Sequence, residues 1–521
     1  MDLSLYLVTD RSLLPVGKPH LEALEQALIG GVTVVQIREK VADTAEFLRV
    51  ARESKALCDR YNVPLLVNDR VDIALAINAR GVHLGQSDMP IDIARKLMPK
   101  GSIIGISCNS LHDVRRARES KADYVGLGAV WDTQTKKLTS SPIGVRGLGV
   151  LLEALDGSDI QAVAIGGIKS TNLARLLHGS VSRTNHTLDG VAVVSDIVAS
   201  PNPETAARRL KSIFNACKRC ILDSPAQNFV WSRGEILDNV TTIMDGVRTL
   251  SPLVHQMTNI VVSNQSANIT LAVGASPIMA TAPEEMSDLS KLSNGLLVNI
   301  GTLVGGSVQG MLKGGYFVNA AKNPVVLDPV GVGASDFRKS SVNELLNAWQ
   351  PTVIKGNAGE LAALAGSSEA ASKGVDSTGG FQDPINFTRQ LARKERCVVV
   401  LTGETDYVSD GKRVLMLKNG HSLLGKVTGS GCMLGSVITA YCAAANALAS
   451  EDDEHEGRLT RSGDFLSAAV GAVLTLTIAS EFAAKREDVH GMGTFLPALL
   501  DEVAALRPEN IRQLAKVEEV E

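Results

Sequence analysis

The first two hundred or so residues alternate between short apolar runs and longer amphipathic stretches. The amphipathic stretches, such as residues 44–61 and 111–120, carry apolar positions at helical spacing, and the runs between them are rich in β-branched residues. Eight runs predict strands, at residues 3–9, 32–37, 65–67, 81–84, 103–107, 124–130, 162–165 and 190–194. A strand followed by a helix, repeated in this way, predicts a TIM (β/α)8 barrel, in which functional side chains follow the carboxyl ends of the strands.

The strand–helix repeat stops after a helix-like stretch at residues 206–221. Ser, Pro, Gln and Asn then follow with little periodicity, so we predict a linker at residues 223–237. This linker would divide the chain into a barrel domain over residues 1–222 and a second domain over residues 238–521.

The second domain again alternates strands and helices. Its apolar runs predict strands at residues 295–300, 325–327, 353–354 and 398–401. Long helical stretches come later, and we expect the acidic residues 518–521 to fray at the surface. The alternation predicts a second α/β domain.

The composition is that of a soluble globular protein. Of the 521 residues, 45% are hydrophobic and 21% charged, which excludes disordered and collagen-like chains. The formal net charge of -4 gives no basic field, so we predict neither a nucleic-acid nor a membrane partner. Seven cysteines without framework spacing, and an N-terminus unlike a signal peptide, predict a cytoplasmic protein with reduced thiols. The apolar stretch 465–484 predicts a buried helix.

Three polar side chains follow the second predicted strand and fall on one side of it. Gln36, Arg38 and Lys40 are two residues apart, so an extended backbone aims them together at the mouth of the barrel. In isolation such a pattern is more often an ion-pair ladder at the surface. At the end of a barrel strand, two converging cations favour an anion-binding site.

Two carboxylates follow the third and fourth predicted strands. Asn68-Asp69 ends strand three, and a Gly-Gln-Ser-Asp segment that finishes at Asp88 ends strand four. Such a pair suits Mg²⁺, which binds one or two carboxylates together with phosphate oxygens and waters. The alternative is that both aspartates are helix N-caps.

Hydroxyl, ammonium and glycine residues follow the later strands. Ser107 ends strand five, a Thr-Gln-Thr-Lys-Lys loop covers residues 133–137, and Gly166-Gly167 and Ser195 follow strands seven and eight. TIM barrels commonly bind phosphate after their last two strands, through backbone N–H groups. The barrel therefore predicts a diphosphate with its metal on one side and a monophosphate opposite.

The barrel motifs resemble, in this order, those of thiamine-phosphate synthase over roughly residues 3–197: Gln-x-Arg-x-Lys, Asn-Asp, Gly-Gln-x-Asp, Thr-x-Thr-Lys and Gly-Gly-Ile. The resemblance implies that a hydroxymethylpyrimidine diphosphate is joined to a thiazole phosphate with release of diphosphate. It implies pyrimidine diphosphate contacts from Gln36, Arg38, Lys40 and Asn68, Mg²⁺ on Asp69 and Asp88, and further ligand contacts from Ser107 and Lys136. It implies thiazole phosphate contacts from Thr133, Thr135, Gly167, Val194 and Ser195. Arg38, Lys40 and Lys136 would act in catalysis by stabilising the departing diphosphate.

Polar residues also follow the strands predicted in the second domain. Asp328 and Glu360 are carboxylates able to support a magnesium nucleotide, and Lys355 and Thr402 are placed to contact phosphates. A turn of small residues at 428–432 precedes a helical run, so its N–H groups and the helix dipole face developing phosphate charge. Alone this turn is a weak signal, because short Gly-Ser segments often serve only as turns.

Together with the segments 254–259 and 275–280, these motifs resemble hydroxyethylthiazole kinase, a ribokinase-like family, over roughly residues 246–500. The resemblance implies that ATP phosphorylates the alcohol of a hydroxyethylthiazole. It implies ATP contacts from Lys355, Thr402 and Gly431, and thiazole contacts from Met279 and Gly429, beside the Mg²⁺ that we place on Asp328 and Glu360 from their chemistry. On its own, Met279 would be interpreted as core packing. Kinases of this family form trimers, so the resemblance also implies a homo-oligomer.

Cys432 occupies the position where many ribokinase-like sugar kinases have an aspartate base. A helix N-terminus would lower its pKa and favour a partial thiolate, which predicts a catalytic base; the alternative is positioning only. Because the kinase would supply the thiazole phosphate that the barrel consumes, we predict a bifunctional thiamine-biosynthetic enzyme. The alternatives are that one half alone is active, or that the chain is a vitamin-sensing binding protein without activity.

Overall fold

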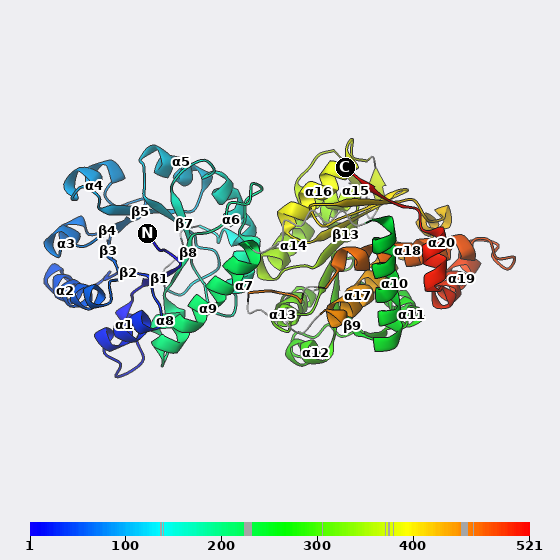
Figure 1. Cartoon of the computed structure of the whole chain (residues 1–521), viewed down its shortest axis with the longest axis horizontal. Helices are drawn as coiled ribbons and strands as arrows, with labels where there is room; N and C mark the ends of the chain where they lie inside the picture. Colours follow the sequence, from blue (N-terminus) through cyan, green and yellow to red (C-terminus); the bar gives the residue numbers. More distant parts are fainter. Residues whose placement is uncertain are drawn as a thin grey trace. The chain divides into compact units, whose positions relative to one another are not determined.

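The computed structural model describes every residue except 136–137, 139, 223–231, 305, 370, 374–375, 379, 450–456 and 462. The chain divides into two compact units. One is built from Met1–Pro225 with His455–Gly457, and the other from Ala226–Glu454 with Arg458–Glu521. Figure 1 shows helices arranged around the strands of the first unit, and a sheet flanked by helices in the second.

Eight parallel strands close the first unit into a barrel, in the order of the chain. The strands are β1 Leu5–Val8, β2 Val34–Ile37, β3 Leu65–Asn68, β4 Gly81–Leu84, β5 Ile103–Cys108, β6 Tyr124–Leu127, β7 Gln161–Ile165 and β8 Gly190–Val193. Strand β8 pairs with β1 and closes the ring. The predicted TIM barrel is confirmed, and each predicted run overlaps one of these strands.

Helices connect the barrel strands and cover them from outside. They are α1 His20–Ile29, α2 Thr44–Arg60, α3 Val71–Ala76, α4 Ile91–Leu97, α5 Leu111–Glu119, α6 Gly144–Glu153, α7 Leu173–Gly179, α8 Ser195–Val198 and α9 Pro203–Leu222. Local signals fix several starts: Asp43 caps α2 and Ser110 caps α5, each side chain accepting a backbone N–H of the first turn.

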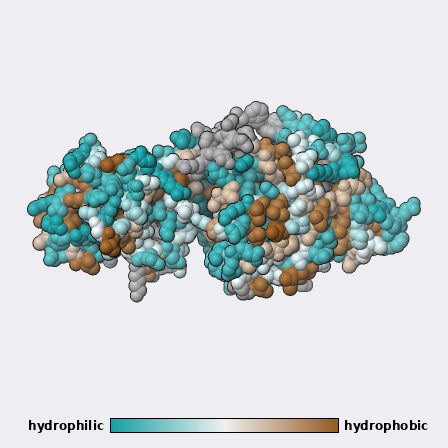
Figure 2. Space-filling model, turned by 90° about the horizontal axis from the view of Figure 1, so that it is seen from below, coloured by the Kyte–Doolittle hydropathy of each residue, from teal (hydrophilic) through white to brown (hydrophobic). Residues whose placement is uncertain are grey.

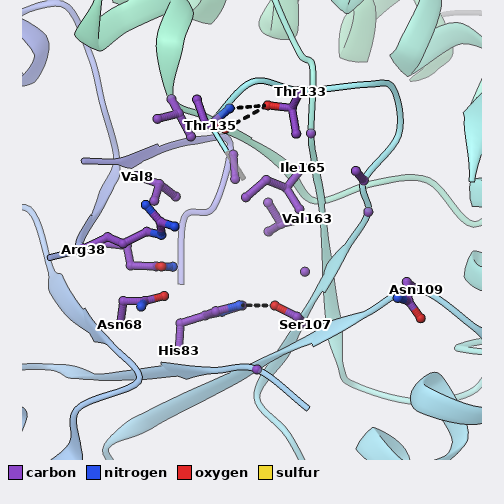
Figure 3. A pocket seen from close by; sticks show the side chains of 18 of the residues that line it. Val8, Arg38, Asn68, His83, Ser107, Asn109, Thr133, Thr135, Val163 and Ile165 are labelled. Carbon is purple, nitrogen blue, oxygen red and sulfur yellow. Dashed lines mark hydrogen bonds between the residues drawn. The ribbon is translucent and has the colours of Figure 1, made fainter. Parts of the chain in front are cut away.

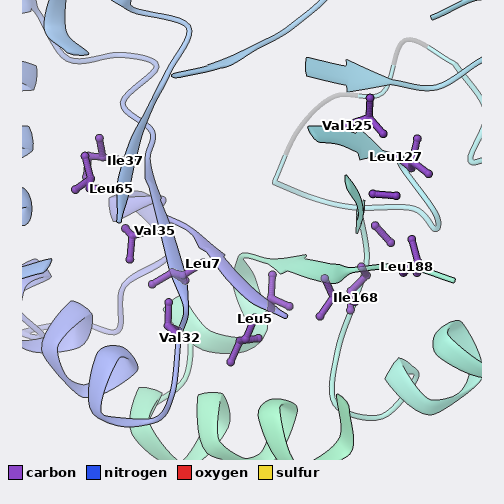
Figure 4. Packing of buried hydrophobic residues seen from close by; sticks show 14 of the residues in the cluster. Leu5, Leu7, Val32, Val35, Ile37, Leu65, Val125, Leu127, Ile168 and Leu188 are labelled. Atoms are coloured by element: carbon purple, nitrogen blue, oxygen red, sulfur yellow. The ribbon is translucent and has the colours of Figure 1, made fainter. Parts of the chain in front are cut away.

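Alternate residues of each barrel strand face opposite sides of the sheet, because side chains along a strand have a period of two. Leu5 and Leu7 of β1 pack outward in the same cluster as Ile37 of β2 (Figure 4). Tyr6 and Val8 instead point into the barrel interior, which holds its own buried cluster. Inward positions near the carboxyl ends of the strands therefore lie at the barrel mouth.

A nine-stranded sheet forms the second unit, in the order β10-β9-β11-β12-β13-β16-β17-β18-β19. The strands from β10 to β16 are parallel, and the last three are antiparallel to their neighbours. Their bounds are β9 Leu253–Met257, β10 Ser276–Ile278, β11 Gly295–Asn299, β12 Val325–Asp328, β13 Val353–Asn357, β16 Val398–Thr402, β17 Asp406–Ser409, β18 Val414–Leu417 and β19 Val517–Val520. Two short strands, β14 Ala371–Lys373 and β15 Asp376–Thr378, form a separate pair.

Helices flank this sheet: α10 Arg233–Leu250, α11 Ser263–Ala272, α12 Met286–Leu292, α13 Ser307–Ala320, α14 Asp336–Ala348, α15 Ala358–Ala365, α16 Pro384–Glu395, α17 Ser430–Leu448, α18 Phe465–Ala483, α19 Met492–Ala505 and α20 Pro508–Leu514. Helices α17 and α18 are long and apolar enough to cross a membrane, yet 83% of the most apolar stretch of each is buried inside the unit. We assign both to its core. The predicted helix over 465–484 is thus found buried, and the predicted second α/β domain is confirmed.

Two boundaries differ from the sequence analysis. Helix α10 begins at Arg233, inside the predicted linker, because Ser232 and Glu235 form a capping box that starts the helix there. The rest of the linker lies outside the described residues. The acidic C-terminus does not fray: residues 517–520 form the edge strand β19, which pairs with β18 and leaves Glu518 and Glu519 exposed.

Candidate active sites

A cavity of about 640 Å³ opens at the carboxyl ends of the barrel strands. Twelve residues predicted from the sequence line it: Gln36, Arg38, Lys40, Asn68, Asp69, Asp88, Ser107, Thr133, Thr135, Gly167, Val194 and Ser195. Figure 3 shows the side chains of Arg38 and Asn68 pointing into this cavity. Lys136 lies outside the described residues.

Both predicted cations have a carboxylate partner at the cavity. Nη1 of Arg38 lies 3.3 Å from Oδ2 of Asp10, and the ammonium of Lys40 contacts Asp69. The backbone N–H of Arg38 donates to Oγ1 of Thr9 at 3.0 Å, which fixes the start of this segment. A guanidinium carries five N–H donors and an ammonium three, so each cation retains donors for an anionic ligand.

The two predicted metal carboxylates lie in the same cavity and cap neither of the following helices. The N-cap residues of α3 and α4 are Arg70 and Pro90, so the helix-cap alternative is wrong. Oδ2 of Asp88 accepts the N–H of Gly85 at 2.7 Å. Burial, and then a hydrogen bond with Asp69, raise the pKa of Asp88. Two carboxylates that disfavour each other's charge are stabilised by a cation between them.

Two carboxylates facing one cavity form a donor set that Mg²⁺ accepts. Among the described residues, no group of three or more His, Cys, Asp or Glu side chains is placed to hold a metal ion. Magnesium commonly takes one or two carboxylates and completes its shell with waters and substrate phosphates.

The opposite side of the cavity is suited to a phosphate. The hydroxyls of Thr133 and Thr135 lie 2.8 Å apart, in the loop after β6. Gly167 has φ +69°, and a Cβ atom there would lie 2.8 Å from the carbonyl oxygen of Asp132. Only glycine fits this close turn, which brings the backbone at Gly167 against Asp132 in the loop after β6.

Three ring-bearing side chains that face the cavity were not predicted. Tyr6, His83 and Tyr124 come from β1, β4 and β6 and line the cavity beside Ser107. His83 Nε2 lies 2.9 Å from Oγ of Ser107 (Figure 3). Each of them lies at an inward position of its strand. Counting every second residue from Gln36 would have identified inward positions only on the strands that neighbour β2.

The second unit gathers polar side chains at the carboxyl ends of β11, β12 and β13. Nζ of Lys355 lies 2.8 Å from Oδ1 of Asp328, and the side chains are 4% and 0% exposed. Nδ2 of Asn299 donates to Oδ2 of Asp328 at 2.8 Å. Burial raises the pKa of Asp328 although Lys355 opposes it, and the charge of Asp328 raises the pKa of Lys355 against the effect of burial.

Cys432 completes this cluster from the start of α17. Its Sγ accepts Nδ2 of Asn299 at 3.2 Å and Nδ2 of Asn259 at 3.5 Å. Burial, and then the charge of Asp328, raise the pKa of Cys432 to about 11. The expected lowering by the helix N-terminus is therefore wrong, because desolvation outweighs it. A raised pKa favours the neutral thiol of Cys432, and with it positioning over base catalysis.

Glu360 organises the loops around the cluster. Its Oε1 accepts the N–H of Gly331 at 3.0 Å, and its Oε2 accepts the N–H of Asn357 at 2.9 Å. Asn357 in turn caps α15, so the two residues form a capping box. Because both carboxylate oxygens of Glu360 already accept a hydrogen bond, Glu360 would bind a metal through their remaining lone pairs or through bound waters.

The small-residue turn before α17 approaches the cluster. Gly429 has φ +88°, and a Cβ atom there would lie 2.5 Å from Cγ1 of Val262. A Cβ atom on Gly431 would lie 3.4 Å from Nζ of Lys355. The turn thus sets the first N–H groups of α17 beside the buried Lys355.

Two remaining predicted residues lie at different distances from this cluster along the sheet. Thr402 ends β16 and is opposite Asn357 in the register of β13, so it adjoins the Glu360 loop. Met279 follows the edge strand β10, which is separated from β12 by β9 and β11. Its side chain is 37% exposed. Core packing is therefore not the role of Met279, and the structure does not bring it into the Asp328 cluster.

Comparisons with known proteins match both halves of the chain. The sequence profile of the thiamine monophosphate synthase family matches residues 5–197, and that of the hydroxyethylthiazole kinase family matches residues 244–509. These two ranges include the barrel cavity and the Asp328 cluster.

Two relatives are similar over nearly their whole length. The probable thiamine biosynthetic bifunctional enzyme of Schizosaccharomyces pombe is 36% identical over 100% of this chain and 99% of its own. The thiamine biosynthetic bifunctional enzyme of Saccharomyces cerevisiae is 35% identical over 98% of this chain and 96% of its own. The hydroxyethylthiazole kinase of Histophilus somni is 44% identical over 52% of this chain and 96% of its own.

Proposed function

The chain belongs to the bifunctional thiamine-biosynthetic enzymes, with thiamine-phosphate synthase and hydroxyethylthiazole kinase activities, and from this premise we propose which side chains carry each reaction. The vitamin-sensing alternative and the one-active-half alternative are set aside, because each half matches an enzyme family and gathers charged side chains at the carboxyl ends of its strands. The kinase uses ATP to phosphorylate a thiazole alcohol, and the synthase joins the thiazole phosphate to a pyrimidine diphosphate.

For the barrel, the supporting observation is that cations and carboxylates meet in one cavity. Arg38 and Lys40 bind the diphosphate of the pyrimidine substrate, and Asn68 and Gln36 contact it beside them. As the bond to diphosphate breaks, positive charge grows on the pyrimidine methyl carbon and negative charge on the leaving group. The fixed cations stabilise that leaving charge, so catalysis rests on electrostatics and positioning.

The thiazole phosphate binds on the other side of the cavity. Hydroxyls of Thr133, Thr135 and Ser195 and the backbone at Gly167 and Val194 hold its phosphate. This places the thiazole nitrogen toward the pyrimidine, where it attacks the methyl carbon. The test is a steady-state one: Thr133→Val should raise the KM for thiazole phosphate and leave the KM for the pyrimidine diphosphate unchanged.

For the second unit, the supporting observation is the buried cluster of Asp328, Lys355, Asn299 and Cys432 beside the turn at Gly429. The N–H groups that open α17 stabilise the phosphoryl group in transfer, and Lys355 and Thr402 contact the phosphates of ATP. The neutral thiol of Cys432 orients the thiazole alcohol. Met279, at the sheet edge, contacts the thiazole ring.

Mg²⁺ is proposed for both sites. When bound, it neutralises the phosphate charge that each reaction transfers or releases. Asp69 and Asp88 hold it in the barrel, and Asp328 and Glu360 hold it, with its waters, in the kinase. Magnesium titrations of the two separate rates test this. Asp88→Asn should raise the magnesium requirement of the synthase only, and Glu360→Gln that of the kinase only.

We propose that the chain is a homo-oligomer through its second unit. Several large apolar side chains of that unit are exposed, among them Ile260, Val261, Leu271, Leu292, Val304 and Phe337. Figure 2 shows hydrophobic residues grouped on the face of this unit that is in view. Exposed apolar groups of this kind mark association surfaces. Light scattering should give a multiple of the 55.0 kDa chain mass, and a monomer would contradict the proposal.

A cytoplasmic location is also proposed. The six cysteines whose side chains the structure describes are buried and form no disulfide with one another, as expected in a reducing compartment. Fluorescence microscopy of the tagged chain tests this, and a signal confined to an organelle would contradict it.

A further inference from the structure

One arginine of the second unit binds three backbone carbonyl groups at the carboxyl ends of the strands. Nη1 of Arg338 donates to the carbonyl oxygen of Ile300 at 2.9 Å and to that of Val330 at 2.7 Å. Its Nη2 donates to the carbonyl oxygen of Gly301 at 2.7 Å. Ile300 and Gly301 directly follow β11, and Val330 follows β12, so one guanidinium ties together the ends of two paired strands.

The backbone of Arg338 is itself held in place. Arg338 lies in the first turn of α14, and Oγ of Ser335 caps this helix by accepting the backbone N–H of Arg338 at 3.3 Å. The arginine is half-buried. A guanidinium has only donors and a carbonyl oxygen only accepts, so the direction of each of the three bonds is settled. Each bond therefore restrains one peptide group of the two loops.

The peptide group between Ile300 and Gly301 passes this restraint to Asn299. Its carbonyl oxygen accepts Arg338, and its N–H donates to Oδ1 of Asn299 at 3.0 Å. Because a backbone N–H can only donate, the oxygen of the Asn299 amide must be the atom that faces it. The nitrogen Nδ2 of the same amide then faces the buried cluster.

A second asparagine is oriented in the same way. Oδ1 of Asn259 accepts the backbone N–H of Val261 at 3.1 Å, so its Nδ2 is the atom that donates to Oδ1 of Asn299, at 2.9 Å. A Cβ atom on Gly301 would lie 2.7 Å from Nδ2 of Asn259, so the loop after β11 packs directly against this amide. The loop that Arg338 holds therefore contacts both asparagines.

Both amides end on the thiol of Cys432. Sγ of Cys432 accepts Nδ2 of Asn299 at 3.2 Å and Nδ2 of Asn259 at 3.5 Å. Nδ2 of Asn299 also donates to Oδ2 of Asp328 at 2.8 Å. With two donors facing its sulfur, the thiol directs its S–H bond away from both asparagines.

We infer that Arg338 is a positioning residue of the kinase, which acts through the Ile300–Gly301 peptide and Asn299 to orient the thiol of Cys432. Loss of the guanidinium frees this peptide to rotate, so the Asn299 amide loses its fixed orientation and Cys432 loses a donor. The inference rests on the proposed kinase site and adds to it a residue that orients its thiol.

The first test is a kinetic comparison of the full wild-type chain with Arg338→Ala. A small misplacement at a reacting group can cost about 100-fold in rate, so we expect the kcat of phosphorylation to fall by about 10- to 100-fold. The KM for ATP should stay within about 2-fold, because Lys355 and the N–H groups that open α17 are unchanged. Guanidinium ion at low millimolar concentration should restore part of kcat, since it supplies the same planar donors at a half-buried position.

The second test reads the orientation of the thiol without activity. The S–H stretching band of Cys432 is isolated as the infrared difference between each chain and its Cys432→Ser counterpart. In Arg338→Ala this band should shift in frequency, because Sγ no longer accepts Asn299 in the same geometry, and guanidinium ion should reverse the shift. A role of Arg338 confined to stability would leave the band unchanged.

Arg248→Ala is the matched control. Arg248 is also half-buried, and its guanidinium donates to the carbonyl oxygen of Leu506. It lies near the end of α10, just before β9 begins, and so at the edge of the sheet opposite the Cys432 site. Destabilisation from the loss of an arginine–carbonyl bond should appear in both variants, whereas kcat and the S–H band should change only in Arg338→Ala.

Opposite results separate this inference from the proposed function. An Arg338→Ala chain with the wild-type kcat, or with a lowered kcat and an unshifted S–H band, overturns the coupling. Equal changes of kcat in Arg338→Ala and Arg248→Ala overturn it as well. A wild-type chain that phosphorylates no thiazole alcohol would instead reject the kinase site, and the S–H band would still decide whether Arg338 orients Cys432.

Discussion

Replacing Lys355 alone should destabilise the second unit far more than replacing both Lys355 and its ion-pair partner Asp328. In Lys355→Met the carboxylate of Asp328, which is fully buried, loses the ammonium 2.8 Å away and keeps the hydrogen bond from Asn299. Breaking a buried ion pair from one side typically costs about 3–5 kcal/mol, because an uncompensated charge remains. Against a domain stability of about 5–15 kcal/mol, that is a large fraction.

The double variant Lys355→Met with Asp328→Asn removes both charges. The asparagine can still accept the N–H of Asn299, so we expect it to recover about 2 kcal/mol or more of the loss. Neither variant should retain kinase activity, since both residues belong to the proposed site. The double variant should therefore regain stability relative to Lys355→Met without regaining kinase activity.

Unfolding of the second unit can be followed on its own through Trp349. This side chain is fully buried in the second unit, and its indole N–H donates to the carbonyl of Met311 at 3.1 Å. With Trp131 and Trp231 replaced by Phe, tryptophan fluorescence in urea reports only that unit. A loss below about 1 kcal/mol in Lys355→Met, or a double variant no more stable than the single one, would refute the reasoning.

Three further results are expected. Gly429→Ala should abolish phosphorylation, because the left-handed backbone costs about 1–2 kcal/mol for alanine and the new Cβ atom would lie 2.5 Å from Val262. As a control, Gly425→Ala, whose new Cβ atom has nothing within 4 Å, should leave the rate unchanged in the same kinase assay. Asp406 has its pKa raised by burial to about 7, so between about pH 4 and pH 7 the folded state binds more protons than the unfolded state and stability falls as pH rises. Asp406→Asn should flatten that slope in urea unfolding and add up to about 4 kcal/mol at pH 8, and an unchanged slope would contradict this. Because the pKa of Cys432 is about 11, the pH profiles of phosphorylation between pH 7 and 9 should be the same for the wild-type chain and Cys432→Ser. A titration step that is present in the wild type and missing in Cys432→Ser would show that Cys432 is the base.

The barrel and most of its cavity follow from local pattern. Strand–helix alternation sets the fold, and the polar residue after each apolar run, such as Arg38 or Asp88, reaches the mouth because parallel strands end together. The same counting does not reveal that Tyr6 and His83 both contact Tyr124, because these contacts join strands that are far apart in sequence.

The second unit was less predictable from sequence, for two physical reasons. The edge strand at 517–520 is acidic and short, and it becomes a strand only because β18 offers unpaired backbone groups beside it. The pKa of Cys432 depends on burial and on Asp328, which no motif spacing reveals.

The central claim is that two separate clusters of side chains carry two consecutive reactions in one chain. The direct measurement supplies the thiazole alcohol, ATP, Mg²⁺ and pyrimidine diphosphate to the purified protein and follows thiazole phosphate and thiamine phosphate by mass spectrometry. At a magnesium concentration that suffices for the wild-type sites and not for the variant ones, Asp88→Asn should accumulate thiazole phosphate without thiamine phosphate. Under the same conditions Glu360→Gln should form thiamine phosphate only when thiazole phosphate is added. Wild-type yields of thiamine phosphate from Asp88→Asn, or loss of both reactions in either variant, would contradict the account.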